Sequence, residues 1–177
     1  MAVRKRPSDY QENSIRVLKG LEPVKSRPGM YTLTDNPLHI IQEVLDNASD
    51  EVLGGFGDTI TLTMCADGSV AVEDNGRGIP VGIHPTEGIP TVELVFTQLH
   101  AGGKFDKASG GAYSFSGGLH GVGVSVTNAL SRHLNVTVWR DGKQYDIGFA
   151  DGFVSEPLTE QPSSRGKKYT GTRVQCL

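Results

Sequence analysis

Hydrophobic positions along the chain follow two spacings, one typical of helices and one typical of strands. Between residues 38 and 53, apolar side chains recur three or four positions apart, which predicts an amphipathic helix. Asp35 or Asn36 is placed to cap this helix, and Pro37 suits its first turn. The same spacing predicts shorter helices over residues 13–19, 91–99 and 120–131.

Alternating apolar and polar residues predict strands. Two hairpins are predicted, each with an Asp-Gly pair at its turn: residues 59–65 with 70–73, and residues 136–140 with 144–149. A further strand is predicted over residues 171–177. The proline-containing residues 22–30 predict an extended connection, and the glycine-rich residues 100–118 show neither period and predict a mobile loop.

The order of these elements predicts the fold class. Helices and hairpins do not alternate as in a doubly wound parallel sheet, so we expect an α+β fold with an antiparallel or mixed sheet and helices on one face. The chain is 37% hydrophobic and 21% charged, as in soluble domains. Its apolar runs fall well short of the ~20 residues that cross a bilayer. The distant Cys65 and Cys176 suggest neither disulfides nor a metal spacing, so we expect a cytoplasmic protein away from membranes.

Charge is distributed unevenly. The net charge is -3, and the segment between Arg27 and Arg77 lacks lysine and arginine but carries many carboxylates. A charge run alone favours a solvated acidic face, and the alternative is a region that binds a cation. Because the cations are scattered, direct DNA binding by this chain is not expected.

Four polar residues form a stripe on the predicted helix. His39, Glu43, Asn47 and Asp50 are four, four and three positions apart, which places them on one face, opposite the apolar residues. The amide oxygen of Asn47 suits a magnesium ion that mainly contacts phosphates. Glu43 is then placed to activate a water, with His39 holding or polarising it. A purely structural polar face is the alternative.

A turn after the second predicted strand carries the next candidate. Asp74 ends that strand and can accept a hydrogen bond from an exocyclic amine such as that of adenine. Gly76 and Gly78 let the backbone turn and let a flat ligand approach. An Asp-Asn-Gly turn often only reverses the chain. A simple reversal needs neither the second glycine, Gly78, nor the following Ile79-Pro80, so a binding role is favoured in this context.

The third candidate is the glycine-rich segment from Ser116 to Gly123, which runs into a predicted helix. Backbone N–H groups at a helix start form a phosphate cradle. The pattern is neither a P-loop nor a dinucleotide fingerprint. Lys104, at the other end of the loop, is placed to reach a phosphate. For His120 alone, a capping or core role is favoured.

In this order, the three segments resemble the GHKL (Bergerat-fold) ATPases, and more narrowly the N-terminal ATPase domain of bacterial type IIA topoisomerase B subunits. The matching blocks are Glu43-x-x-Asp46-Asn47-Ala48-x-Asp50-Glu51, Asp74-x-Gly76-x-Gly78-Ile79-Pro80, Leu99 to Phe105, Ser116 to Gly123, Gly20 to Val24, Arg27 to Tyr31 and Gly171-Thr172. The resemblance implies a two-layer sandwich with a mixed, mostly antiparallel sheet, helices on one face and a glycine-rich ATP lid. Residues 30–39 and 92–94 resemble the topoisomerase IV branch more than the gyrase branch.

The resemblance also implies residue roles. Glu43 is the implied general base, supported by His39, and Asn47 is the implied magnesium ligand. Asp74 with Thr172 reads adenine. The remaining implied ATP-binding residues are Tyr10, Asp50, Glu51, Arg77, Gly78, Ile79, Pro80, Lys104, Tyr113, Gly117, Gly118, Leu119, His120, Gly121, Val122 and Gly123. The implied inhibitor pocket, an aminocoumarin target, comprises Arg77, Arg140, Asp74 and Thr172.

The implied cofactors are ATP and Mg²⁺, and the implied organisation is a flexible arm over residues 1–9 followed by an ATP-binding domain over 10–177, before a transducer domain. Partners implied are a second copy joined through the arm when ATP binds, the A subunit of topoisomerase IV in a heterotetramer, and DNA through other domains. The isolated chain is expected to be monomeric and to bind ATP with little turnover, because the family's next domain supplies a lysine.

The longer lid segment over residues 106–112 departs from the family pattern. Alternatives are a gyrase B domain, another GHKL protein, or a binding-only module.

Overall fold

The computed structural model describes residues 15–101 and 123–177. The strands are β1 (Ile60–Met64), β2 (Val70–Asp74), β3 (His133–Arg140), β4 (Lys143–Ala150), β5 (Phe153–Pro162) and β6 (Gly171–Cys176). The helices are α1 (Glu22–Ser26), the short 3-10 helix η3 (Pro28–Met30), α2 (His39–Leu53), α3 (Thr91–Thr97) and α4 (Gly123–Leu130).

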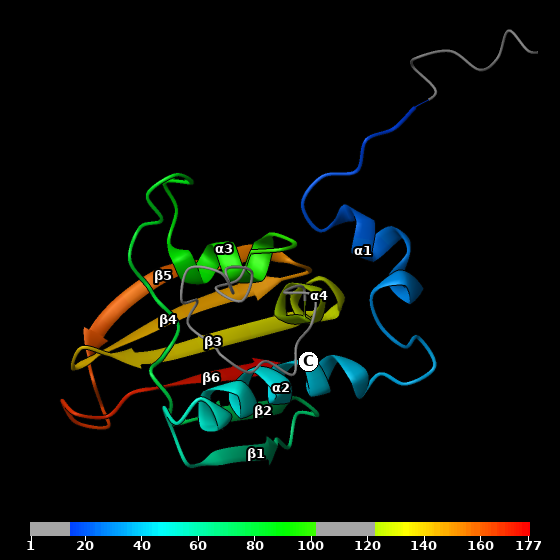
Figure 1. Ribbon diagram of the computed structural model, residues 1–177. Coiled ribbons are helices and arrows are strands. Elements are labelled where there is room, and N and C mark those ends of the chain that lie inside the picture. Colours follow the sequence, from blue (N-terminus) through cyan, green and yellow to red (C-terminus); the bar gives the residue numbers. More distant parts are fainter. Residues whose placement is uncertain (1–14, 102–122) are drawn as a thin grey trace, which may run out of the picture.

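The strands form a single sheet in the order β1-β2-β6-β3-β4-β5, and every neighbouring pair in it is antiparallel. Helices α2, α3 and α4 lie together across one face of this sheet (Figure 1). The predicted α+β class is therefore confirmed. Of the two sheet types expected, the described strands form the antiparallel one.

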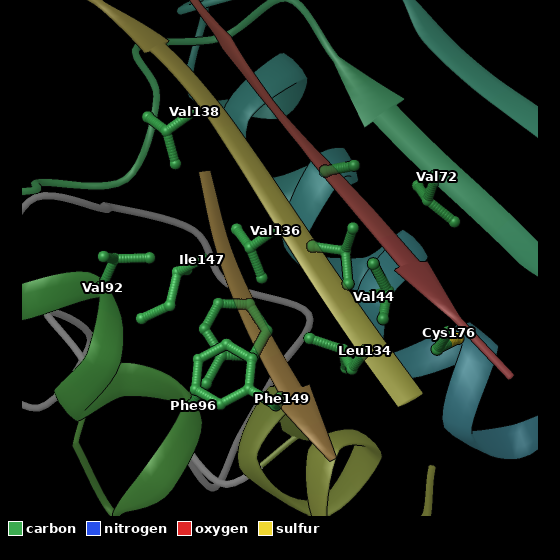
Figure 2. Packing of buried hydrophobic residues seen from close by; sticks show 12 residues of the cluster. Val44, Val72, Val92, Phe96, Leu134, Val136, Val138, Ile147, Phe149 and Cys176 are labelled. Atoms are coloured by element: carbon green, nitrogen blue, oxygen red, sulfur yellow. The ribbon is translucent and has the colours of Figure 1, made fainter. Parts of the chain in front are cut away.

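The core lies between the sheet and these helices. Alternate residues of the central strands point toward the helices because side chains alternate along a strand. Figure 2 shows Leu134, Val136 and Val138 of β3 on this face, with Phe96 of α3 packed near Phe149 of β4. The rings of Phe96 and Phe149 stack with centroids 5.6 Å apart. Truncating a buried phenylalanine of this kind costs about 3 to 5 kcal/mol, so this pair holds α3 to the sheet.

The predicted long helix and both hairpins are confirmed, with small shifts at their ends. Helix α2 begins at His39, so Pro37 lies before its first turn. The N-cap is Leu38, which makes no side-chain capping bond, so the expected cap at Asp35 or Asn36 is wrong. Asn36 instead stabilises the turn before the helix, because its Oδ1 accepts a hydrogen bond from the Leu38 N–H at 3.1 Å. The predicted helix over 91–99 ends earlier, at Thr97. Residues 102–122 lie outside the described residues, so most of the loop predicted over 100–118 and the start of the helix predicted over 120–131 are not described.

Two predictions near the N-terminus are wrong. Residues 15–19 form no helix, and residues 22–30 form α1 and η3 instead of an extended connection. The prolines caused the second error, over residues 22–30. Pro23 and Pro28 each sit in a first helical turn, where the missing N–H costs nothing. Burial decides the helix position, since Val24 of α1 packs with Leu21 against residues of α4.

Strand β5 was not predicted from the sequence. It pairs with β4 at one edge of the sheet and is largely exposed, so it lacks a clear apolar alternation. Pro157 and Pro162 also argue against a central strand, although an edge strand tolerates both. The opposite edge strand, β1, carries neither proline nor charge, and its Leu62 and Met64 are 52% and 81% exposed.

Candidate active site

Strands β2 and β6 bring Asp74 and Thr172 side by side. The two residues are register partners at the end of β2 and the start of β6. They share the helix-facing side with the core residues two positions away, and each is only 7% exposed. The Asp74 Oδ1 accepts a hydrogen bond from the Gly76 N–H at 2.8 Å, and the Thr172 Oγ1 accepts one from the Ile79 N–H at 3.2 Å. A carboxylate and a hydroxyl are thus fixed beside one turn.

Burial dominates the electrostatics of Asp74. It raises the pKa of the Asp74 carboxyl to about 6, and the nearby Glu51 and Glu73 carboxylates add to the rise. The Gly76 N–H opposes it by stabilising the charged form. At neutral pH, Asp74 is therefore an ionised acceptor kept in a site that disfavours its charge, which is unusual for a residue with only a structural role.

The raised pKa predicts a pH-dependent stability difference between the wild type and Asp74→Asn. The pKa of this carboxyl is near 4 in the unfolded chain and about 6 in the folded one, so the folded protein holds the proton more tightly. The resulting stabilisation is fully present below about pH 4 and is lost as the pH rises through about 6. We expect the unfolding free energy of wild type to fall relative to Asp74→Asn by roughly 2 to 3 kcal/mol between pH 4 and pH 7. Urea unfolding of both proteins across this range measures the difference, and parallel curves would contradict the assignment.

The turn after Asp74 has no space for larger residues at its glycines. A Cβ at Gly76 would lie 2.7 Å from the Glu51 Oε2 and 2.9 Å from the Asp74 Oδ1. Gly78 has a φ of 75°, and a Cβ there would lie 2.8 Å from the Trp139 carbonyl oxygen. Both positions require glycine because protein atoms surround them. The close approach of a flat ligand expected from the sequence stays a prediction.

Two arginines lie along this turn. The Arg77 guanidinium donates to both oxygens of Glu51, with Nη2 at 2.8 Å from Oε1 and Nε at 3.2 Å from Oε2, and the Arg77 N–H donates to Oε2 at 2.9 Å. Its guanidinium carbon lies 3.4 Å from the centroid of the Phe56 ring. Arg140 donates from Nη1 to the Gly78 carbonyl oxygen at 2.9 Å. The predicted mouth residues therefore border the turn that carries Asp74.

The acidic residues at the C-terminal end of α2 are buried, although the polar stripe was expected to lie apart from the apolar face; His39, Glu43 and Asn47 of that stripe are partly exposed. Asp50 is 1% exposed and Glu51 is 9% exposed, like their apolar neighbours Val44 and Ala48 at 4% and 3%. Tertiary packing overrides the helical pattern here, because α2 contacts both α4 and β2. The alternative of a solvated acidic face therefore does not hold for this end of the helix.

The other end of α2 approaches the start of α4. A Cβ at Gly123, the first residue of α4, would overlap the Glu43 carboxylate. The positive end of the α4 dipole therefore faces Glu43. Asn47 donates from Nδ2 to the Glu43 carbonyl oxygen at 2.8 Å, which fixes the plane of its amide, and the His39 Nδ1 lies 2.8 Å from the Thr32 Oγ1.

The site thus has two ends joined by α2. Glu51 lies beside Asp74, and Glu43 lies two helical turns away, about 12 Å along the axis. Several predicted site residues lie outside the described residues: Tyr10, Lys104, Tyr113, Gly117, Gly118, Leu119, His120, Gly121 and Val122.

Sequence reasoning missed three residues that support the site. Phe56 covers Arg77, Thr32 contacts His39, and Asn75 joins two turns by accepting from the backbone of Asp58 and Thr59. Only Phe56 had a signal in the sequence, since Gly54 and Gly55 before it allow the chain to turn back at the end of α2. A Cβ at Gly54 would lie 2.9 Å from the Phe56 ring.

Comparison with known proteins places this arrangement in a family. Residues 33–176 match the family described as histidine kinase-, DNA gyrase B-, and HSP90-like ATPase. The chain belongs to this family. It is 52% identical over 167 residues to the B subunit of DNA topoisomerase 4 from Francisella tularensis subsp. holarctica, covering 94% of this chain and 26% of that relative. The chain therefore spans about a quarter of the length of this relative.

Two solved structures are similar to the fold. The topoisomerase IV ATP-binding domain of Francisella tularensis, in complex with a small-molecule inhibitor, has a TM-score of 0.74 and 46% identity, covering 90% of this chain and 72% of that one. The 43K ATPase domain of Thermus thermophilus gyrase B, in complex with an aminocoumarin, has a TM-score of 0.72 and 44% identity, covering 88% and 38%. The predicted resemblance is confirmed: the chain is an ATPase domain homologous to the B subunits of topoisomerase IV and gyrase.

Within the described residues, none of the helices is long and apolar enough to cross a membrane.

Proposed function

We propose that this domain binds ATP with the adenine at Asp74 and Thr172 and the phosphates at the start of α4. One observation carries the proposal: α2 joins a buried carboxylate–hydroxyl pair at one end to a carboxylate at a helix N-terminus at the other. A nucleoside triphosphate likewise has a flat polar base at one end and anionic oxygens at the other.

The base end suits adenine because Asp74 presents a buried carboxylate acceptor beside the hydroxyl of Thr172. The Asp74 Oδ1 already accepts from Gly76, and the carboxylate retains further lone pairs for the exocyclic amine. Thr172, Gly78 and Ile79 border the same turn. Arg77 and Arg140 then form the mouth of the site, where we place inhibitors of the aminocoumarin kind.

The phosphate end is at Gly123, where the backbone N–H groups and the dipole of α4 favour anions. We assign the remaining cradle to residues 117–122, with Lys104 and Tyr113 closing over the phosphates. Because a Cβ at Gly123 would overlap the Glu43 carboxylate, Glu43 lies beside this cradle.

A magnesium ion fits this end of the site. Among residues 15–101 and 123–177, no group of three or more His, Cys, Asp or Glu is arranged to hold a metal. Mg²⁺ commonly takes one or two protein ligands and completes its shell with phosphates and water, so a single amide oxygen at Asn47 is chemically sufficient. The bound ion would neutralise phosphate charge during transfer.

Hydrolysis needs a base beside the terminal phosphate, and we assign this role to Glu43. Its carboxylate would accept a proton from the attacking water. His39 would orient Glu43 or the water, and the contact of its Nδ1 with Thr32 fixes the ring. Because the family's next domain supplies a lysine to the terminal phosphate, the isolated chain should bind ATP with little turnover.

In the whole protein, we propose an ATP-hydrolysing type II DNA topoisomerase of the topoisomerase IV branch, located in the cytoplasm. ATP binding would join two B subunits through the N-terminal arm, including Tyr10, and close a gate for DNA strand passage, decatenation and relaxation. Two copies of the A subunit would complete the heterotetramer, and other domains would hold DNA. A gyrase B protein is the second candidate, because the solved gyrase domain is almost as similar as the topoisomerase IV domain.

Calorimetric titration with a non-hydrolysable ATP analogue tests the proposal. We expect the chain to bind the analogue, and Mg²⁺ to strengthen binding. In Asn47→Ala, we expect the affinity with magnesium to fall to nearly the magnesium-free value, because the ion loses its protein ligand. Gln42→Ala, an exposed change on the same helix, serves as the control and should match the wild type. Absence of binding to the folded wild type would contradict the proposal.

A further inference from the structure

A polar and aromatic cluster lies directly behind the base end of the site, on the sheet face turned away from the helices. Glu73 precedes Asp74 on β2, so its side chain points to the opposite face. Its carboxylate accepts from the Arg165 Nη2 at 2.9 and 3.1 Å and from the Tyr169 hydroxyl at 3.0 Å. Arg173 of β6 adds its Nε at 4.0 Å. The Glu73 side chain is 16% exposed, whereas those of Arg165 and Arg173 are 46% and 33% exposed, so the carboxylate is shielded and its arginine partners remain partly open to water.

Aromatic packing reinforces this cluster. Trp139 of β3 is 4% exposed, and its ring meets that of Tyr169 edge-on with centroids 5.5 Å apart. The Arg165 guanidinium lies 4.9 Å from the Trp139 ring and 5.1 Å from the Tyr169 ring. Both rings lie within cation–π distance of this guanidinium, which adds to the attraction of its ion pair with Glu73.

The cluster fixes one connection, the loop of residues 163–170 between β5 and β6. Ser164, at its start, donates to the Gln144 Oε1 at 2.9 Å, and the same oxygen accepts from the Trp139 Nε1 at 3.1 Å. Near its end, Tyr169 is bound to Glu73. We call this arrangement the back clamp: Glu73, Trp139, Gln144, Arg165 and Tyr169.

The loop held by the back clamp leads directly into the base end of the site. Gly171 follows it, and a Cβ there would overlap the Asp74 carbonyl oxygen, so β6 starts in close contact with β2. Thr172 comes next, beside Asp74 and bonded to the Ile79 N–H. The position of the Thr172 hydroxyl therefore depends on where the loop enters β6.

We propose that Glu73 is a positioning residue for base recognition: through Arg165 and Tyr169 it holds the entry of β6, and so sets Thr172 and the Ile79 amide against Asp74. This inference rests on the proposed function, because the base is taken to be adenine. Glu73 itself faces away from the ligand and would act on the position of Thr172 through the loop and through Arg173 of β6. Its charge also adds to the rise of the Asp74 pKa, and titration at pH 8 keeps Asp74 ionised whether or not that charge is present.

Glu73→Gln tests the back clamp because it removes the charge and keeps the shape. Tyr169→Phe removes a single hydroxyl and serves as a second, milder variant. Glu160→Gln is the matched control, since it breaks an exposed ion pair with Lys143 on the same sheet, where both side chains are about half exposed. All titrations are made at pH 8, so that Asp74 stays ionised in every variant.

Two measurements separate positioning from general destabilisation. The first is the ratio of affinities for non-hydrolysable ATP and ITP analogues, because hypoxanthine lacks the exocyclic amine while sharing the ribose and phosphates. We expect Glu73→Gln to weaken the ATP analogue by about five- to tenfold and the ITP analogue much less, so the ratio falls. The second is hydrogen exchange at the Ile79 amide, which should become faster in Glu73→Gln and unchanged in Glu160→Gln.

The outcomes distinguish the two proposals. If the wild type binds the ATP analogue and Glu73→Gln keeps both the ratio and the Ile79 protection, the back clamp has no positioning role and this inference alone fails. If the wild type binds no analogue, the proposed function fails and takes this inference with it. If Glu73→Gln does not fold, Tyr169→Phe gives the same comparison, with a smaller fall in the ratio supporting the inference and no fall overturning it.

Discussion

Replacing Asp74 with asparagine is expected to abolish binding of adenine nucleotides while leaving the domain folded. The amide has the same shape, and its oxygen can still accept from the Gly76 N–H. Its NH₂ group would then face the exocyclic amine, so two donors would meet in a site where Asp74 is only 7% exposed. A buried donor without an acceptor strongly weakens ligand binding. We therefore expect the affinity for adenine nucleotides to fall by at least about 100-fold. Calorimetry with a non-hydrolysable ATP analogue measures this loss.

A second aspartate provides the control for this change. Asp67 lies in the turn between β1 and β2 and accepts from the Ser69 N–H at 3.0 Å, away from the site. Asp67→Asn keeps an acceptor there and should bind the analogue like the wild type. Binding by Asp74→Asn at wild-type affinity would show that another group reads the base.

Replacing Gly171 with alanine is expected to damage both the fold and the site. The added Cβ would overlap the Asp74 carbonyl oxygen, and all three of the nearest atoms are backbone atoms of Asp74 and Asn75, which cannot rotate away as a side chain could. Relief requires β6 to move from β2, which breaks the register that pairs Asp74 with Thr172. Overpacking of this kind typically lowers the unfolding free energy by about 1 to 3 kcal/mol. Because strand pairing is lost as well, we expect Gly171→Ala to lower it by about 3 kcal/mol or more. Urea unfolding gives the loss in stability, and calorimetry should show no nucleotide binding.

Gly82→Ala is the matched control, because an added Cβ at Gly82 meets no atom within 4 Å. Its unfolding midpoint should equal that of the wild type within error. If Gly171→Ala unfolds at the wild-type midpoint as well, β6 does not contact β2 as closely as described.

Elements with strong local periods could be predicted from the sequence. Helix α2 and both hairpins were expected because apolar spacing and Asp-Gly turns act within a few residues. Strand β5 and helix α1 were not, because their prolines indicate breaks and their positions are decided by contacts with β4 and α4. Edge strands and first helical turns are the places where proline is compatible with regular structure.

The residues of the candidate site also differ in whether the sequence alone could indicate them. Asp74, Asn47 and Glu43 were singled out because their residue types contradict an ordinary turn or an ordinary solvated helix face. Thr172 came only from the family resemblance, since nothing near it in the sequence indicates that β6 will pair with β2.

The contact of Phe56 with Arg77 was not predicted at all. It joins the end of α2 to the turn after β2, and this proximity exists only once both elements pack together. The roles of the residues outside the described part of the chain, such as Lys104 and Tyr113, stay predictions.

The two edges of the sheet differ in how they meet other molecules. On β5, Pro157, Pro162, Glu156 and Glu160 discourage a neighbouring strand, since proline lacks a donor and like charges repel. On β1, an uncharged run of threonine, leucine and methionine leaves backbone groups and apolar side chains accessible. If this domain aggregates, we therefore expect strands to add at β1 rather than at the β5 edge. Solubility engineering should begin with a lysine on β1, which leaves the ligand-facing residues untouched.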